Sequence, residues 1–262
     1  MRRFSFLLIS FISFFGFSSA VSQAEFLGNP ATGLLVLEKK DEYYLYVPPD
    51  YTTEKTWTLL VVLGERGNDP KQAIQPWIDW AKEHGLLVAA VPHLVPEHDL
   101  PEGADKWLLG VLHEIIERYR VDPAGVLLVG LGSGGHYAAY LGLKYPGEFS
   151  AAALAGEAWS GPYERLMRPS PRPESQISFY VALDPKGEAY PAAEQKALEL
   201  EQKGYSIKFE SLQSGQDLVE FREPMMQWFQ ENQEFRTAKS RQVQKGGMKK
   251  TFRKILRNVF QM

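Results

Sequence analysis

Serine and histidine side chains that could support nucleophilic catalysis lie close together in one part of this sequence. Ser133 stands in the glycine-rich run Gly130-Leu131-Gly132-Ser133-Gly134-Gly135, and His136 follows it three residues later. A serine hydroxyl becomes an effective nucleophile when a neighbouring base accepts its proton. Residues three apart on a helix share one face, but this imidazole would point along the helix rather than approach the hydroxyl from an opposite loop. We therefore expect His136 to have a packing role.

A second group of polar side chains, His93, His98 and Asp99, could hold a metal ion. They follow an expected strand, at the sheet edge where the ligands of open α/β sheets gather. Their spacing fits no closed zinc pattern, so we expect a solvated loop and predict no metal and no other cofactor. The run from Gly130 to Gly135 lacks the Gly-x-Gly-x-x-Gly order and the P-loop lysine, which argues against a nucleotide site.

The elements that must position these residues alternate between strands and helices. A hairpin comes first, and its two strands flank the polar turn Lys39-Lys40-Asp41. Later strands are continuous apolar runs, which is typical of strands covered on both faces, and the helices between them repeat apolar residues at intervals of three and four. Expected strands are 33–38, 42–47, 56–64, 86–91, 126–129, 177–183 and 206–210; expected helices are 76–84, 105–119, 134–145, 192–203 and 223–232. This order predicts an α/β protein with a mostly parallel, doubly wound sheet and an N-terminal antiparallel hairpin.

The central segment carries a family resemblance. Residues 118–140, which include Val-Leu-Leu-Val-Gly-Leu-Gly-Ser-Gly-Gly-His-Tyr, and the following Tyr145-Pro-Gly-Glu-Phe149 are similar to esterases of the polyhydroxybutyrate-depolymerase and feruloyl-esterase type, within the α/β-hydrolase superfamily. Tyr44-Leu-Tyr-Val-Pro-Pro-Asp-Tyr51 matches the opening of the same family. The resemblance extends from about Gly33 to Phe229 and implies an α/β-hydrolase fold.

The resemblance also implies where a catalytic triad would lie, and this chain departs from it. The family's turn reads Gly-x-Ser-x-Gly-Gly, which places Gly132 at the nucleophile position. Asp184 matches the family's acid, and the family's histidine corresponds to Gln216, whose amide has no titratable nitrogen near neutral pH. We therefore expect a degenerate catalytic triad at Gly132, Asp184 and Gln216. In the alternative register Ser133 is the nucleophile, with Leu131 where a small residue belongs; otherwise Ser133 is expected to help cap the helix.

The oxyanion region departs as well. The family's first core strand ends in Leu-His-Gly, whereas this chain reads Leu63-Gly64-Glu65. Glu65 would bring a carboxylate close to the place where negative charge develops, which opposes the stabilisation that an oxyanion hole provides. Gly64 and Glu65 thus mark a weakened oxyanion region.

The two ends of the chain differ from the body in composition. Residues 1–24 combine Arg2 and Arg3, an apolar run and small-residue cleavage sites, which is typical of a secretory signal peptide. The absence of cysteine excludes disulfides and thiolate chemistry. Segment 25–234 is the expected α/β-hydrolase domain and carries 18 basic and 32 acidic residues, a net charge of −14. Segment 235–262 carries nine basic residues and no acidic one.

The basic tail has an amphipathic pattern. Within 248–260 the apolar residues fall on one helical face and the lysines and arginines on the other. Such a helix suits an anionic membrane surface or a groove of a protein partner, and the alternative is a tail that docks on its own acidic domain. No nucleic acid is expected as a partner.

These observations predict an exported α/β-hydrolase-fold protein, periplasmic or secreted and in contact with the membrane if the tail binds it. The departures at the triad predict an esterase-like pseudoenzyme with a binding or structural role at the cell envelope. The alternative is a secreted carboxylic-ester hydrolase that uses Ser133 or a non-standard site.

Overall fold

The computed structural model describes residues 31–39, 41–92, 102–159, 161–172, 176–212 and 220–233. These residues belong to one compact unit, which extends from Ala31 onwards. The predicted signal peptide, the basic tail, His93, His98, Asp99 and Gln216 lie outside the described residues.

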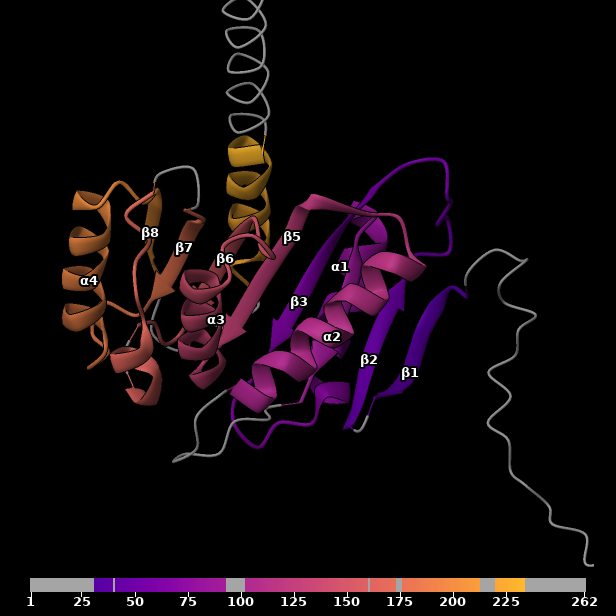
Figure 1. The fold of residues 1–262 in the computed structure, drawn as a ribbon, viewed down its shortest axis with the longest axis horizontal. Coiled ribbons are helices and arrows are strands. Elements are labelled where there is room, and N and C mark those ends of the chain that lie inside the picture. The colour runs from indigo at the N-terminus through magenta and orange to yellow at the C-terminus, as the bar shows by residue number, and fades with distance from the viewer. Residues whose placement is uncertain are drawn as a thin grey trace, which may run out of the picture. The chain divides into compact units, whose positions relative to one another are not determined.

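Eight strands form one sheet in the order β1-β2-β4-β3-β5-β6-β7-β8 (Figure 1). β1 pairs antiparallel with β2, and β2 pairs antiparallel with β4. All other neighbours are parallel. The strands are β1 (Gly33–Lys39), β2 (Asp41–Val47), β3 (Trp57–Leu63), β4 (Leu87–Val91), β5 (Val121–Leu131), β6 (Ala151–Ala155), β7 (Ser178–Leu183) and β8 (Ile207–Ser211). The predicted fold class, a mostly parallel sheet with an N-terminal antiparallel hairpin, is confirmed.

Helices cover both faces of this sheet. The labelled helices are α1 (Pro70–His84), α2 (Glu102–Arg118), α3 (Ser133–Lys144) and α4 (Tyr190–Gln202), with a short 3₁₀ helix η2 (Gly161–Leu166), and residues 222–233 are also helical. Buried side chains of α2, α3 and α4 pack on one face, and those of α1 and of helix 222–233 pack on the other. This two-sided cover explains why the central strands are apolar throughout.

β6 and η2 were not predicted, and α1 and β5 begin several residues before their predicted starts. β6 has the sequence Ala-Ala-Ala-Leu-Ala, whose alanines favour a helix, and no strand was predicted there. All five residues are buried between β5 and β7, so tertiary packing overrides local propensity. α1 begins at Pro70 rather than at Pro76, because Asp69 caps it by accepting the backbone N–H of Lys71 at 2.8 Å.

None of the helices in the described part of the chain combines the length and the apolar character needed to cross a membrane.

Candidate functional site

The turn between β5 and α3 lies at the edge where the parallel strands end. Gly132 is the single residue between the strand and the helix, with φ 51° and ψ −127°, a conformation that L side chains rarely adopt. Its N–H donates to the carbonyl of Ala155 at the end of β6, at 2.8 Å. Its own carbonyl accepts the N–H of Gly135 at 2.8 Å, which closes the first turn of α3. The sequence thus makes a sharp strand-to-helix elbow with glycine at its tip.

Three further glycines allow the backbones around this elbow to approach closely. A Cβ on Gly130 would lie 2.5 Å from the carbonyl oxygen of Gly134, and a Cβ on Gly134 would lie 2.7 Å from that of Gly64. A Cβ on Gly135 would meet the carbonyl group of Glu157. These neighbours are backbone atoms and cannot rotate away, so the first turn of α3 can pack against the ends of β3 and β6 only if these positions are glycine.

The space beside the tip of the elbow is occupied by a carboxylate. A Cβ built on Gly132 would lie 2.5 Å from Cγ and 2.7 Å from Cδ of Glu65, which comes from the loop after β3. The volume that the side chain of a nucleophile would need is therefore filled by Glu65. This side chain is exposed and flexible, so it fills the space without being locked there.

The side chain of Ser133 bonds to that same loop. Its Oγ accepts the backbone N–H of Arg66 at 2.8 Å. Gly132 is the N-cap of α3 and no side-chain cap hydrogen bond is made, so the expectation that Ser133 caps the helix is wrong. The reason is geometric: the glycine tip places Ser133 inside the first helical turn, facing the β3 loop. A backbone N–H at this place could serve an oxyanion, but here it already has an acceptor.

The structure describes the position expected for the acid but not the position expected for the base. Asp184 directly follows β7 and is half-buried. Its Oδ1 accepts the N–H of Lys186 and its carbonyl accepts the N–H of Gly187, both at 2.9 Å, which is a turn at the strand end. Gln216 lies outside the described residues, so its distance from Gly132 stays a prediction.

Each of the three described histidines contacts a glutamate. Nε2 of His136 lies 2.5 Å from Oε2 of Glu157, while its buried Nδ1 has no hydrogen-bond partner within the described part of the chain. Burial lowers the pKa of His136, and the charge and hydrogen bond of Glu157 oppose this shift. His84 pairs with Glu223 at 3.2 Å and His113 pairs with Glu148 at 2.8 Å. Among the residues that the structure describes, no histidine is bonded to Ser133.

A metal site is not formed by the described side chains either. No group of three or more His, Asp or Glu residues within the described ranges could hold an ion. The predicted candidates His93, His98 and Asp99 lie outside those ranges, so the prediction of a solvated loop there stays a prediction.

No protein-family model and no curated protein matches this sequence. Solved structures do match its fold. S-formylglutathione hydrolase from Staphylococcus aureus is 14% identical, with a TM-score of 0.62, over 78% of this chain and 98% of that one. The chain has the α/β-hydrolase fold. The fluorophosphonate-binding serine hydrolase F of S. aureus is 13% identical, with a TM-score of 0.59, over 79% of this chain and 99% of that one. A carboxylesterase from Bacillus cereus is 16% identical, with a TM-score of 0.55, over 72% of this chain and 93% of that one.

These structural neighbours are esterases and serine hydrolases, and their low identity to this chain establishes the fold alone. In the α/β-hydrolase fold the nucleophile stands at a strand-to-helix elbow. That elbow is present here between β5 and α3, and the residue at its tip is Gly132.

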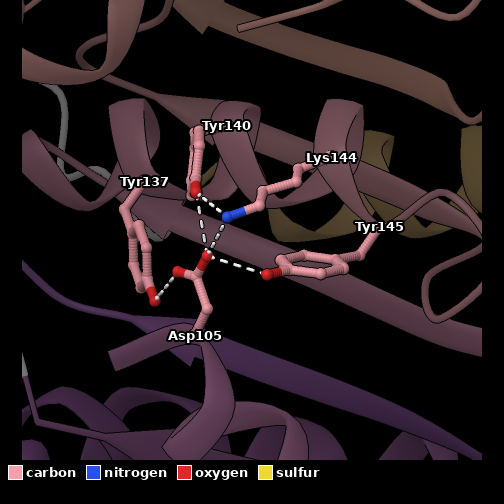
Figure 2. Close-up of polar contacts among 5 residues, drawn as sticks. All are labelled: Asp105, Tyr137, Tyr140, Lys144 and Tyr145. Carbon is pink, nitrogen blue, oxygen red and sulfur yellow. Dashed lines mark hydrogen bonds and ion pairs between the residues drawn. The ribbon is translucent and has the colours of Figure 1, made fainter. Parts of the chain in front are cut away.

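A buried polar cluster joins α2 to α3 on the face covered by these helices (Figure 2). Asp105 is fully buried, and its two carboxylate oxygens accept the hydroxyls of Tyr137, Tyr140 and Tyr145 and the ammonium of Lys144, at 2.8–3.0 Å. Lys144 also donates to the hydroxyl of Tyr140 at 2.5 Å. Four donors satisfy the buried charge, as burial of a carboxylate requires.

This Asp105 cluster is built for structure rather than for proton transfer. Burial, with the nearby Asp105 carboxylate, raises the pKa of Tyr137. Burial also raises the pKa of Tyr140 to about 12, although Lys144 opposes it. Both hydroxyls are therefore protonated donors at neutral pH.

Sequence reasoning missed Asp105, Glu157 and Trp159. Asp105 was expected only to begin the helix 105–119. The available signal was the spacing Tyr140-x3-Lys144, which places two of its partners on one helix face. Glu157 and Trp159 follow β6, which was itself not predicted. No local signal marks Trp159, whose φ of 52° makes it the one described non-glycine residue with positive φ.

Proposed function

We propose that this chain is an α/β-hydrolase-fold protein without serine-hydrolase activity, which has a binding or structural role at the cell envelope. The observation that carries the proposal is the elbow: its tip is Gly132, and the volume of the missing side chain holds the carboxyl group of Glu65. A serine hydrolase needs a hydroxyl at that point and a base that accepts its proton. The position matched to the base is Gln216, an amide.

The electrostatics of the elbow support the same proposal. Ester hydrolysis passes through an oxyanion that preorganised N–H groups must stabilise. The N–H of Arg66 is already bonded to Ser133 Oγ, and the Glu65 carboxylate beside it would repel developing negative charge. Removal of one oxyanion donor alone costs about 10²–10³-fold in turnover, and loss of the general base costs about 10²–10⁴-fold more.

A serine-directed fluorophosphonate probe tests this proposal. We expect no labelling of the native protein above that of heat-unfolded protein, and background hydrolysis of p-nitrophenyl butyrate. Stoichiometric labelling that disappears in Ser133→Ala would establish the alternative, a carboxylic-ester hydrolase that uses Ser133. Labelling that persists in Ser133→Ala would reveal another nucleophile and would equally overturn the proposal.

Restoring the triad tests the assignment of its positions. Gly132→Ser alone should remain poor, because no base is supplied and Glu65 occupies the space. The double variant Gly132→Ser with Gln216→His should gain turnover over the single variant, and a further Glu65→Gly change should add to that gain. A single variant as active as the double would show that a base other than residue 216 serves the elbow.

The envelope role rests on the sequence of the two ends. We propose that residues 1–24 direct export and that residues 248–260 bind an anionic membrane surface. The amphipathic pattern of the tail and its nine positive charges support this. The competing possibility, docking on a protein partner or on the acidic body, has a different outcome in the vesicle experiment described in the Discussion.

A further inference from the structure

The strand at one end of the sheet, β1, has an open outer edge. All seven of its residues pair with β2 in an unbroken antiparallel register, and β1 ends the strand order (Figure 1). On its other side the described part of the chain places no strand. An edge strand of this kind presents a row of unpaired N–H and C=O groups, which is a template for a further strand.

The side chains on this edge are apolar where contact with water would favour charge. Leu34 is 38% exposed and Val36 is 57% exposed, and they lie on the same face of β1 because they are two residues apart. Among the described residues, Leu198 on α4 is the only other exposed large apolar side chain. Exposed apolar surface is therefore concentrated on this edge.

The opposite edge of the sheet differs from β1. β8 has five residues, of which the second is the exposed Lys208. Short edge strands and lysine side chains block pairing between sheet edges. β1 has seven residues, no proline and no bulge, and its charged residues Glu38 and Lys39 are confined to its last two positions. Of the two edge strands, β1 is thus the one suited to accept another strand.

The sequence of the β1 edge is complementary to itself. When two antiparallel copies are centred on Leu35, Leu34 lies opposite the partner's Val36 and Leu35 lies opposite the partner's Leu35. Thr32 then lies opposite the partner's Glu38, so polar residues meet at both ends. Registers centred on residue 36 or 37 instead place Glu38 opposite Leu34 or Val36. The register centred on Leu35 matches apolar with apolar and polar with polar residues.

Charge does not oppose this pairing, and the two-fold symmetry limits it. The two Glu38 carboxylates lie at opposite ends of the paired segment, six residue steps or about 20 Å apart, which exceeds the Debye length of about 8 Å. On the other face Leu35 and Leu37 already pack against the core, and pairing would extend that apolar layer. Each copy closes the edge of the other, so association stops at a dimer.

We propose that β1 binds β1 of a second copy of this chain, antiparallel and centred on Leu35, so that the two sheets become one continuous sheet. A single strand pair buries less than the roughly 1,200 Å² of a standard stable interface, so the dimer is weak, with an expected Kd of about 10–100 µM. The residues of the elbow do not lie on β1. Dimerisation is therefore independent of whether the chain hydrolyses esters, and fluorophosphonate labelling and association can fail separately.

Sedimentation velocity of the full chain at 1–300 µM tests the proposal. The weight-average mass should rise with concentration from the 29.7 kDa of the monomer towards twice that value. A chain that remains monomeric at 300 µM would contradict the proposal, and it would be the expected result if another segment of the chain covered the edge.

One pair of variants locates the interface. Val36→Lys should raise the Kd at least about tenfold, because it places an ammonium against the partner's Leu34 and leaves it poorly solvated. Leu198→Lys is the matched control, since Leu198 is 55% exposed and lies on α4; its Kd should be unchanged. Both variants should keep a near-native Tm, as is usual at exposed positions. Undiminished association of Val36→Lys, or equal losses in the two variants, would rule out the β1 edge.

A charge swap tests the register. Leu34→Glu should also weaken its own homodimer at least about tenfold. When it is mixed with Val36→Lys, the proposed register sets the new carboxylate directly opposite the new ammonium and leaves one Leu34–Val36 contact intact. Native mass spectrometry of the mixture should show a heterodimer at least about threefold tighter than either homodimer, as expected for one cross-strand charge pair. A mixture without this preference would refute the pairing centred on Leu35.

Discussion

Replacing Gly132 by alanine should cost more stability when Glu65 is present than when it is absent. The cost has two parts that the structure separates. An L residue at φ 51°, ψ −127° carries backbone strain of about 1–3 kcal/mol. The new methyl group would also meet the Glu65 side chain, with Cγ at 2.5 Å, and would force that exposed chain into another rotamer at a cost of about 0.5–1.5 kcal/mol.

The double-mutant cycle isolates the second part. Gly132→Ala should lower the free energy of unfolding by about 1.5–4.5 kcal/mol in the native background and by about 1–3 kcal/mol in Glu65→Ala. The coupling is then about 0.5–1.5 kcal/mol, within the range found for residues in contact. Urea unfolding followed by circular dichroism measures all four proteins, and unchanged m-values would show that the unfolded states are comparable.

Gly134→Ala is the control for this cycle. Its Cβ would lie 2.7 Å from the carbonyl oxygen of Gly64, a backbone atom that Glu65→Ala does not remove. Its cost should therefore be the same in both backgrounds. Zero coupling between residues 132 and 65 would refute the conclusion that Glu65 fills the space of the missing nucleophile. Equal coupling at residue 134 would show that Glu65→Ala loosens the elbow in general.

Three further predictions concern other parts of the chain. Asp105→Asn should lower the free energy of unfolding by about 3 kcal/mol, because it breaks a buried ion pair whose lysine is partly exposed. The control is Asp122→Asn, which keeps a side-chain oxygen that can accept the exposed N–H of Ala124. It should change the free energy of unfolding by less than about 0.5 kcal/mol. Hydrogen bonds from two lysines lower the pKa of Glu199 from 4.5 to about 2, so its stabilising contribution is present above pH 4.5 and is lost as the pH falls towards 2. The stability difference between wild type and Glu199→Gln should therefore shrink over that interval in acid titrations of urea unfolding. Residues 248–260 should become helical on anionic vesicles, and vesicle binding should weaken as the salt concentration rises. Deletion of 235–262 should abolish vesicle binding without changing the Tm of the protein. A large fall in Tm would indicate that the tail docks on the acidic body.

The sheet could be predicted from the sequence because its central strands are apolar along their whole length. β3 and β5 contain Leu-Leu-Val-Val-Leu and Val-Leu-Leu-Val, which are typical of strands covered on both faces. β6 could not be predicted in the same way, because an alanine-rich run favours a helix until its neighbours are known. Its small side chains fit where α3 packs closely over the sheet, and that packing is a property of the assembled fold.

The site was only partly predictable, for a related reason. Glycines at 130, 132, 134 and 135 mark a tight strand-to-helix turn, and their spacing places Gly132 at its tip. The contact between Ser133 and Arg66 joins residues 67 positions apart, and it depends on how the β3 loop folds over the helix start. Likewise, no local sequence pattern encodes the positive φ of Trp159.

The glycines of the elbow are explained by packing without reference to catalysis. Gly130, Gly134 and Gly135 face backbone carbonyls at distances that exclude a Cβ, so the first turn of α3 could not sit against β3 and β6 with any other residue. A protein of this fold that catalysed nothing would still need all three. A glycine-rich elbow is consequently a signature of the fold, and only the residue at its tip, with the base opposite, bears on hydrolysis. In this chain the tip carries no side chain, and a carboxylate from the neighbouring loop stands in its space.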